Sequence, residues 1–374
     1  MLAHRPPPIH GAAIVGDLVY QELKLTNLEL KYIGLSTSSS ISDNGKINFK
    51  KFYLFARILK SLLIGIIMYR PSIIYLTPSV NGISFYRDFL FLLLLKIYKY
   101  GFKDCRIIFH LHMRPVRQTW LKKKYLFYLF LKNIEVIFLS KILINDYSHN
   151  NLKNSVCHIL PNTIKPLLSK ELAIKKTMEY YSEIKVKNSN ANILYLGHLM
   201  ESKGYKRALD IAKTILKKRE GYNFLFVGEF NSSFDKKYFD NYVNSNDIGS
   251  NVKYLGPCTK DIDKINFLIS SDILILPSYS EAYPLTILEA FSLGLPVVAT
   301  DTGAIREIVR GDYGKIVSDD STHEDYIKNF SQALLKQKRK CNQNLAIKCI
   351  VDFHKRWSEK KFSKKLSKIV NNTV

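Results

Sequence analysis

The chain has 374 residues, which is too long for one ordinary domain and fits two domains of roughly 150 to 200 residues each. A hydrophobic content of 47%, with only 12 Pro and 17 Gly, excludes a disordered or low-complexity protein. The five cysteines form neither a C-x-x-C pair nor a metal-like spacing, which favours reduced thiols and therefore a cytosolic protein.

The formal net charge of +24 is unevenly distributed, because residues 51–132 hold 15 Lys or Arg against only two acids, Asp88 and Asp104. Nucleic acid, an anionic membrane surface and an A/T-rich genome that favours Lys codons could each account for a basic chain. Codon bias does not explain the clustering, so we favour a functional basic surface. No recognisable nucleic-acid module accompanies the charge, and we expect no nucleic-acid partner.

No segment predicts a signal peptide or a membrane span. The N-terminal sequence MLAHRPPPIHG has three prolines where a signal peptide needs an apolar run. The most apolar stretch, residues 54–71, is interrupted by Arg57 and Lys60 and falls short of the ~18 uninterrupted apolar residues of a membrane span. We therefore expect a soluble or peripheral protein in the cytoplasm, with the inner face of the plasma membrane as its peripheral site.

The first half of the chain alternates between apolar strands and longer helical segments. Only four residues precede the segment RPPP, so a first strand there can span about 13 Å at most. In chain order we predict a helix near 50–68, a strand at 72–76, a helix near 83–100, a strand at 105–110, a helix near 119–132 and a strand at 135–140.

The second half repeats the alternation of strands and helices, which predicts parallel α/β sheets with right-handed crossovers. Two such sets predict two Rossmann-like domains, with a hinge at LPNTIKP (160–166), where two prolines flank a turn. We place a first domain at 1–163, a second domain at 164–350 and a C-terminal helix at 351–374 that could pack on the first domain. The strands of the second half are predicted at 192–197, 223–228, 251–256, 272–277 and 296–300.

Residues 277–300, PSYSEAYPLTILEAFSLGLPVVAT, follow a strand with a loop, Pro284 and a helix that Gly294 ends. Ligands of such sheets bind at the carboxyl ends of the strands, and a helix N-terminus suits a diphosphate. Glu289, one turn into the helix, could accept hydrogen bonds from two ribose hydroxyls, and Glu281 could face a sugar beyond the phosphates. Alternatively, both carboxylates are solvated or interact with the helix dipole.

Five segments resemble, in the same order along the chain, those of family 4 retaining glycosyltransferases, a branch of the group 1 glycosyltransferases. SEAYPLTILEAFSLGLPVVATDTGAIREIV looks like the E-x7-E segment of that family, and GHLMESKGY like its phosphate loop. PPPIHGAA resembles its first loop, HLHMR its histidine segment and LPNTI its interdomain linker. The resemblance implies the GT-B fold, in which two Rossmann-like domains face each other across a cleft. It also implies that 1–163 is the acceptor domain and 164–350 the nucleotide-sugar donor domain.

The resemblance also implies roles for single residues. Glu281 matches the first family glutamate, near the donor sugar and catalysis, and Glu289 matches the second, which contacts the nucleotide ribose. Lys203 matches the lysine that neutralises the leaving diphosphate. His110 and His112 alternate at the strand period of two, so we expect only one of them to face a site. His112 is the better match to the family histidine near the donor sugar.

Further donor contacts are implied in both domains. Gly11 matches the glycine whose missing side chain lets the first loop approach the donor phosphates. His198 stands where many members carry an arginine, and it could help to hold the diphosphate only when protonated. Backbone groups at the start of the helix would hold sugar hydroxyls and diphosphate, namely those of Tyr283, Pro284, Leu285 and Thr286.

The segment DID at 261–263 resembles the metal-binding D-x-D of the other glycosyltransferase fold. It precedes KINFLISSDIL, however, so we predict that it opens a helix, where acids stabilise the positive end. We expect no metal and no cofactor, only a nucleotide-sugar donor such as a UDP- or GDP-sugar.

The resemblance implies a metal-independent hexosyltransferase of the retaining type, acting on a hydroxyl of a glycan or polyprenyl-linked acceptor. Its setting would be bacterial surface polysaccharide, such as capsule or lipopolysaccharide. Segments 50–65 and 120–132 interleave Lys with aromatic and aliphatic residues, so they are either interfacial helices on an anionic membrane or buried Rossmann helices. The alternative functions are a degenerate nucleotide-sugar-binding protein and a nucleotide-sugar epimerase on the same fold.

Overall fold

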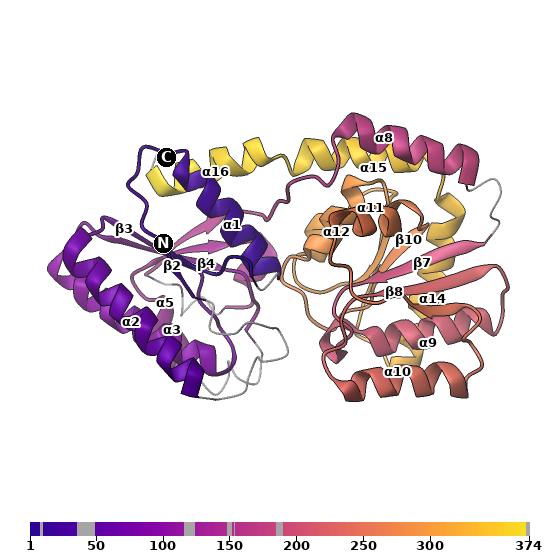
Figure 1. The fold of residues 1–374 in the computed structure, drawn as a ribbon, viewed down its shortest axis with the longest axis horizontal. Helices are drawn as coiled ribbons and strands as arrows, with labels where there is room; N and C mark the ends of the chain where they lie inside the picture. Colours follow the sequence, from indigo (N-terminus) through magenta and orange to yellow (C-terminus); the bar gives the residue numbers. More distant parts are fainter. Residues whose placement is uncertain are drawn as a thin grey trace. The chain divides into compact units, whose positions relative to one another are not determined.

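The computed structural model of the protein describes residues 1–7, 10–35, 49–115, 124–147, 152, 154–184 and 190–371. The chain forms two compact units (Figure 1): the first comprises Met1–Ile164 and Glu359–Val374, and the second comprises Lys165–Ser358. Each unit contains one six-stranded sheet in which every paired strand runs parallel. The predicted α/β class is therefore confirmed.

The sheet of the first unit has the strand order β2-β1-β3-β4-β5-β6. β1 is only two residues long, yet it pairs with both β2 and β3, so a very short strand lies inside the sheet. Hydrogen bonds just beyond the ladder, such as Thr77 N to Leu2 O at 3.0 Å, extend its attachment. The strands are β1 (Leu2–Ala3), β2 (Ile33–Gly34), β3 (Ile73–Leu76), β4 (Arg106–Leu111), β5 (Glu135–Phe138) and β6 (Val156–Ile159).

The helices of the first unit lie on both faces of its sheet, with α1 and α16 on one face and α2, α3 and α5 on the other (Figure 1). Aromatic rings join α3, α5 and β4: Phe85 stacks on Phe127 with centroids 4.8 Å apart, and Phe109 lies 5.0 Å from Phe130. The part of segment 120–132 that the structure describes is thus a helix packed in the core. The helices are α1 (Gly11–Lys24), α2 (Phe49–Tyr69), α3 (Gly82–Gly101), α5 (Lys124–Leu131), α6 (Lys141–Ile144) and α16 (Glu359–Asn371).

An arginine on β4 attaches the last helix to the first sheet. Arg106 Nε and Nη2 donate to the two carboxylate oxygens of Glu135 on β5 at 2.6 and 2.8 Å. The same guanidinium donates to the backbone carbonyls of Ile369 and Val370 in α16. Burial alone would raise the pKa of Glu135, but the hydrogen bonds from Arg106 and His158 lower it from 4.5 to about 2.

The sheet of the second unit has the order β12-β11-β10-β7-β8-β9. All five strands predicted in this half are present, each within a few residues of its expected bounds. Gly294, with φ of +77°, follows α12 as the predicted helix-ending glycine. The strands are β7 (Ala191–Leu196), β8 (Tyr222–Val227), β9 (Val252–Tyr254), β10 (Ile273–Leu276), β11 (Val297–Thr300) and β12 (Gly314–Val317).

Helices cover both faces of the second sheet, with α9, α10 and α14 on one face and α8, α11, α12 and α15 on the other (Figure 1). The predicted helix start at DID is confirmed, because Asp261 and Asp263 lie in the first turn of α11. The helices are α8 (Lys170–Glu179), continued by the π-helical turn Tyr180–Ile184, α9 (Tyr205–Leu216), α10 (Ser233–Ser245), α11 (Asp261–Ile269), α12 (Leu285–Ser292), α13 (Ile305–Ile308), α14 (His323–Lys340) and α15 (Gln343–Arg356).

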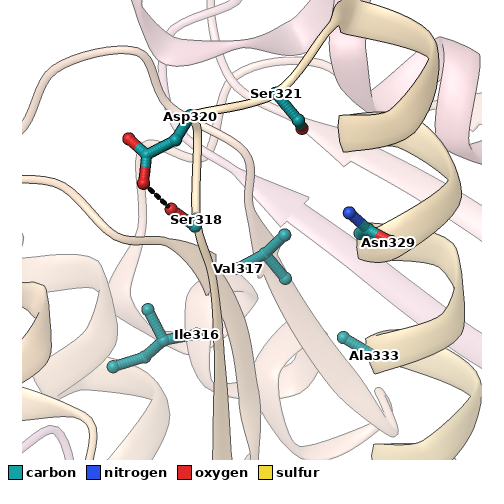
Figure 2. Close-up of a pocket in the computed structure, with 7 residues that line it drawn as sticks. All are labelled: Ile316, Val317, Ser318, Asp320, Ser321, Asn329 and Ala333. Carbon is teal, nitrogen blue, oxygen red and sulfur yellow. Dashed lines mark hydrogen bonds between the residues drawn. The ribbon is translucent and has the colours of Figure 1, made fainter.

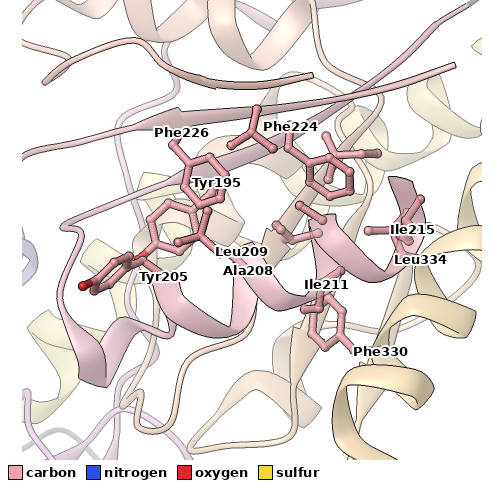
Figure 3. Close-up of a cluster of buried hydrophobic side chains, with 14 of the residues drawn as sticks. Tyr195, Tyr205, Ala208, Leu209, Ile211, Ile215, Phe224, Phe226, Phe330 and Leu334 are labelled. Carbon is pink, nitrogen blue, oxygen red and sulfur yellow. The ribbon is translucent and has the colours of Figure 1, made fainter. Parts of the chain in front are cut away.

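The core of the second unit lies where α9 and α14 pack on the sheet (Figure 3). The apolar face of α9 supplies Leu209, Ile211 and Ile215, which are almost completely buried. Tyr195 of β7 stacks on Phe226 of β8 with centroids 5.4 Å apart. Burial of these large side chains supplies the main driving force that holds the carboxyl ends of the strands in place.

Several elements differ from the sequence-based expectation, among them helix α1, three strands and one helix boundary. β2, β6 and β12, which were not predicted, are all edge strands of their sheets. The first residues of β6, Val156 and Cys157, are exposed. Where the sequence predicts one terminal helix over 351–374, α15 ends at Arg356 and α16 begins at Glu359.

The apolar run in α2 is interrupted as expected, but the helix still reaches membrane length by its mean hydropathy. Residues Phe52–Tyr69 of α2 form an 18-residue window with mean hydropathy 1.7, long and apolar enough to cross a membrane by length and composition alone. Arg57 and Lys60 interrupt the run of apolar residues, but the other side chains outweigh them in the mean. Only 11% of this window is buried in the fold.

Candidate functional site

In the second sheet, the order in which the chain adds strands reverses between two neighbouring strands, β7 and β10. These strands pair through Ile193 with Ile273 and through Leu194 with Leu274. The chain proceeds from β7 through β8 to β9 on one side, and from β10 through β11 to β12 on the other. In such sheets ligands usually bind where the strand order reverses, at the loops that follow the two central strands. The loop after β7 carries His198 and Lys203, and the loop after β10 carries Glu281.

Backbone contacts lock these two loops together. The amide of Tyr279 donates to Ser202 O at 3.0 Å, across the end of the 3₁₀ turn Glu201–Lys203. Gly204, which follows that turn, has φ of +73°, and a Cβ at this position would lie 2.0 Å from Pro277 O. Only glycine fits there without a shift of the backbone, so the position of Lys203 depends on this contact.

Lys203 and Glu281 form an ion pair at this junction. Lys203 Nζ lies 2.9 Å from each carboxylate oxygen of Glu281, and Ser278 Oγ donates to Glu281 Oε1 at 3.0 Å. The Glu281 side chain is 6% exposed, whereas that of Lys203 is 35% exposed. The buried carboxylate thus receives three hydrogen bonds, and the ammonium group is the partner that faces solvent.

A second glycine fixes the backbone of the Glu281 loop from the β11 side. Gly303 has φ of +58°, and a Cβ there would lie 1.9 Å from Glu281 O. The amide of Ala304 donates to Ala282 O at 2.9 Å. The loop is therefore held on one side by Gly204 and on the other by Gly303, which leaves little freedom for Glu281.

The N-terminus of α12 follows directly. Pro284 is its N-cap residue, and within the described chain no side chain caps the helix and no acid lies in its first turn. Tyr283 is buried, and its hydroxyl accepts a hydrogen bond from Trp357 Nε1 at 2.7 Å. Burial raises the pKa of Tyr283 to about 12. Leu285 is buried and Thr286 half-buried, so this segment can offer its backbone amides rather than its side chains.

Glu289 lies one turn into α12 and has a partner that the sequence did not indicate. Lys264, on α11, donates to Glu289 Oε1 at 2.9 Å, and the carboxylate is 12% exposed. Burial would lower the pKa of Lys264, but the charge and hydrogen bond of Glu289 raise it above its ordinary value. Sequence reasoning missed Lys264. It considered only the preceding DID segment as a possible site, and nothing in the sequence showed that α11 lies beside Glu289.

His198 is half-buried in the loop after β7, and its backbone carbonyl accepts a hydrogen bond from Tyr195 Oη at 2.9 Å. The structure thus brings His198, Lys203, Glu281, Glu289 and the start of α12 to the carboxyl edge of one sheet. Gly11 and His112 belong to the first unit.

In the first unit, Gly11 is the first residue of α1, and the side chain of His10 caps that helix by accepting from Ala13 N at 3.3 Å. The glycine that allows a demonstrably close approach is Gly16, where a Cβ would lie 2.1 Å from His4 O. Sequence reasoning missed Gly16, because its neighbour His4, just after β1, is 12 positions away in the chain.

Four histidines gather beside β1 and β4. The rings of His110 and His112 lie 4.1 Å apart, and those of His4 and His10 lie 5.6 Å apart. We expected only one of His110 and His112 to face a site. Positions i and i+2 of a strand share a face, however, and the two rings lie together. His110 is fully buried, with its Nδ1 2.5 Å from Tyr75 Oη.

His4, His110 and His112 all have a lowered pKa and are neutral at pH 7. Burial, and then the neighbouring His10, lower the pKa of His112 to about 3. Burial, followed by Arg87 and the nearby histidines, lowers that of His4 to about 3. Both ring nitrogens of His112 are buried and have no hydrogen-bond partner among the described residues. Unpaired buried nitrogens of this kind call for a partner, such as a ligand or an ordered water.

The described residues include no group of three or more His, Cys, Asp or Glu that could hold a metal ion. A pocket of about 440 Å³ lies between β12 and α14 (Figure 2), where Ser318 donates to Asp320. None of the residues that line it belongs to the predicted set.

Solved structures with low sequence identity share the fold. Sucrose-phosphate synthase from Thermosynechococcus elongatus is 13% identical, with a TM-score of 0.72 over 99% of this chain and 95% of its own. Anabaena HepE in complex with UDP is 14% identical, with a TM-score of 0.64 over 91% of this chain and 86% of its own. These likenesses show the fold alone, and it is the predicted GT-B class.

Curated relatives match parts of the chain. A capsular polysaccharide biosynthesis glycosyltransferase, CapM of Staphylococcus aureus, is 28% identical over 36% of this chain and 34% of its own length. An N,N'-diacetylbacillosaminyl-diphospho-undecaprenol alpha-1,3-N-acetylgalactosaminyltransferase of Campylobacter jejuni is 27% identical over 55% of this chain and 53% of its own. The chain spans between about a third and a half of the length of these relatives.

The second unit carries the likeness to a family. Residues 179–347 include every predicted site residue except Gly11 and His112, and they match the model of glycosyl transferases group 1.

Proposed function

We propose that the protein is a retaining, metal-independent glycosyltransferase that moves a hexose from a nucleoside-diphosphate sugar to a hydroxyl of a glycan or lipid-linked glycan. The observation that carries this proposal is the Lys203–Glu281 pair beside the N-terminus of α12, at the switch point of the second sheet. Cationic and amide donors there can hold a diphosphate, and the buried carboxylate lies directly beside them.

The diphosphate would bind to Lys203 and to the first amides of α12. Two of the three N–H groups of the Lys203 ammonium are directed at Glu281, so the third can reach a phosphate oxygen. The helix N-terminus adds partial positive charge and amide donors at residues 285 and 286. These groups are fixed before the reaction, so they stabilise the negative charge that develops on the leaving diphosphate.

The nucleotide ribose would bind at Glu289. A carboxylate with two oxygens can accept from two vicinal hydroxyls, and Lys264 holds its Oε1 from the other side. Lys264 thereby keeps the carboxylate ionised and oriented. We propose Lys264 as a positioning residue for this contact.

In the proposed reaction the anomeric carbon loses its bond to the diphosphate oxygen and gains a bond to the acceptor oxygen on the same face. The acceptor proton passes to the departing diphosphate, so the step needs no covalent enzyme intermediate. Glu281, held by three hydrogen bonds, would position the transferred sugar. His112 of the first unit, neutral at pH 7, would contact a hydroxyl of that sugar.

The acceptor class and setting are also proposed. A relative named for capsular polysaccharide synthesis and another named for a diphospho-undecaprenol acceptor support a surface-polysaccharide setting. A solved neighbour in complex with UDP supports a uridine nucleotide as a donor component. A polyprenyl-linked acceptor would place the reaction at the cytoplasmic face of a membrane.

The test is a donor screen in which purified protein meets a panel of UDP- and GDP-sugars with a polyprenyl-diphosphate glycan, and nucleoside diphosphate release is followed. We expect release with one donor, undiminished by EDTA, and an anomeric configuration in the product that equals that of the donor by NMR. Lys203→Met and Glu281→Gln should each lower kcat roughly a hundredfold or more.

Lys206→Met is the matched control, because Lys206 lies three residues away and pairs with Glu201 rather than with the site. Its kcat should stay close to that of the parent. Nucleotide binding without release would favour a degenerate nucleotide-sugar-binding protein, and release of an epimerised nucleotide sugar would favour an epimerase. Inversion of the anomeric configuration would contradict the retaining assignment.

A further inference from the structure

α3 exposes an apolar stripe to solvent. Its exposed large residues recur at alternating intervals of three and four, which places them on one face of the helix. A soluble helix normally turns such a face to the core and its charges to water. α3 has a second apolar face, through Phe85, Phe91 and Leu95, that packs inside the unit. The exposed stripe consists of Ile83, Tyr86, Leu90, Leu93, Ile97 and Tyr100.

α2 lies beside α3 and is exposed in the same way. Phe55 of α2 stacks on Phe91 of α3 with centroids 5.7 Å apart, and Figure 1 shows the two helices side by side. The membrane-length window of α2 is 11% buried, with Ile58 and Leu62 turned inward. We call the exposed apolar residues of both helices the α2–α3 face. On α2 they include Phe49, Phe52, Tyr53, Ile64, Ile67 and Met68.

The charges around this face are predominantly positive. Residues 49–104 contain nine Lys or Arg and two acids: Asp88, which is completely buried and paired with Arg87, and Asp104, which is exposed beside Lys103. Arg57, Lys60 and Lys103 are exposed. A cationic rim around apolar side chains complements anionic lipid headgroups, and each cation near such a surface contributes about 1 kcal/mol.

The same charges argue against two other occupants. A second copy of the chain on this face would bring Lys and Arg opposite Lys and Arg, which opposes association. A bilayer-spanning α2 is disfavoured by topology, because α2 follows β2 and precedes β3, and both strands pair with β1 in one sheet. A helix that lies in the interface keeps this sheet intact.

We propose that the α2–α3 face docks on an anionic bilayer, with its apolar side chains between the headgroups and its cations on the phosphates. This docking does not rest on the proposed transfer reaction, because it involves only residues of the first unit and needs no nucleotide.

The experiment measures sedimentation of the full chain with vesicles of phosphatidylcholine alone and of phosphatidylcholine mixed with phosphatidylglycerol. The parent should bind the anionic vesicles, bind the neutral ones much more weakly, and lose affinity in high salt. Ile67→Asn combined with Ile97→Asn should lower the affinity at least about tenfold. Lys60→Glu should lower it about fivefold or more.

Matched controls come from the second unit. Phe234 is 70% exposed, like Ile97 at 70% and Ile67 at 71%, so Phe234→Asn removes an equally exposed apolar side chain outside the face. Lys218→Glu reverses an exposed charge outside the face. Both should bind vesicles like the parent. Because all substituted side chains are exposed, unchanged circular dichroism and melting temperature are expected for every variant.

Three outcomes would overturn the proposal. The parent could fail to bind anionic vesicles, or the controls could reduce binding as much as the face variants. Alternatively, sedimentation equilibrium could show a dimer that Ile67→Asn with Ile97→Asn dissociates, without vesicle binding, which would assign the face to a second copy. Nucleotide release can fail in any of these cases without affecting the vesicle result.

Discussion

The contact between Gly204 and Pro277 makes a prediction whose size can be worked from the structure. In Gly204→Ala, the new methyl group would lie 2.0 Å from Pro277 O, so one of the two loops has to move by about 1 Å. The positive φ of +73° adds the cost of left-handed backbone for alanine, about 1–2 kcal/mol. Overpacking adds about 1–3 kcal/mol, so the second unit should lose about 2–5 kcal/mol.

Gly256 provides a matched control in the same unit. Its φ is +84°, but a Cβ there would meet nothing within 4 Å. Gly256→Ala should therefore cost only the backbone part, about 1–2 kcal/mol. The difference between the two variants isolates the close approach of the site loops, at about 1–3 kcal/mol.

Urea unfolding followed by tryptophan fluorescence measures both variants. The chain has two tryptophans, Trp120 and Trp357, so a Trp120→Phe background leaves Trp357 as the reporter of the second unit. Gly204→Ala should also weaken UDP binding, since Lys203 precedes the altered residue, whereas Gly256→Ala should not. Equal free energies of unfolding for the two variants would refute the reasoning, because the loops would then tolerate a methyl group at their junction.

Three side chains outside that contact test single interactions. Lys264→Met should weaken UDP binding roughly tenfold by releasing Glu289, while pyrophosphate binding changes little. Calorimetry with both ligands measures the two affinities. Equal losses of affinity for UDP and pyrophosphate would argue against a ribose contact. Trp357→Phe removes the N–H that donates to Tyr283 and should cost the second unit about 1–3 kcal/mol in thermal unfolding. An unchanged melting temperature would show that the hydroxyl finds another donor. Glu135→Gln should destabilise the first unit above pH 4.5. The difference in unfolding free energy from the parent should vanish as the pH falls to about 2, because a carboxylate with a lowered pKa stabilises the fold only while it is ionised. A difference that does not depend on pH in urea titrations would contradict the assigned charge.

The sequence predicted the strand, turn and helix that carry Glu281 and Glu289, because each has a local signal. β10 is a continuous apolar run, Pro284 precedes the helix, and Gly294 ends it. The loop that holds Lys203, by contrast, was identified by the family resemblance, and α9 was expected only as one of the helices between the strands. The sequence therefore identified the elements of the candidate site, although the binding and catalytic roles of its residues are still predictions.

Interactions between distant residues left no such signal. Lys203 and Glu281 are 78 positions apart, and their pairing depends on β7 and β10 being neighbours. Lys264 reaches Glu289 from another helix, and only the packing of α11 beside α12 shows it. Whether segment 50–65 is an interfacial or a buried helix was left open for a different reason: a run of residues shows composition, but only the fold shows which side chains face solvent.

The attachment of α16 to Arg106 has a consequence for the order of assembly. The first unit contains the earliest residues of the chain and also the last helix, so the whole second unit is synthesised between its two parts. At ribosomal rates, on the order of 10 to 40 s separate Ile164 from the carbonyls that Arg106 binds. The second unit, which is continuous in sequence, can fold during that interval. The half of the molecule that is made first is therefore the half completed last, and a nascent chain stalled before residue 359 would present Arg106 without its backbone partners.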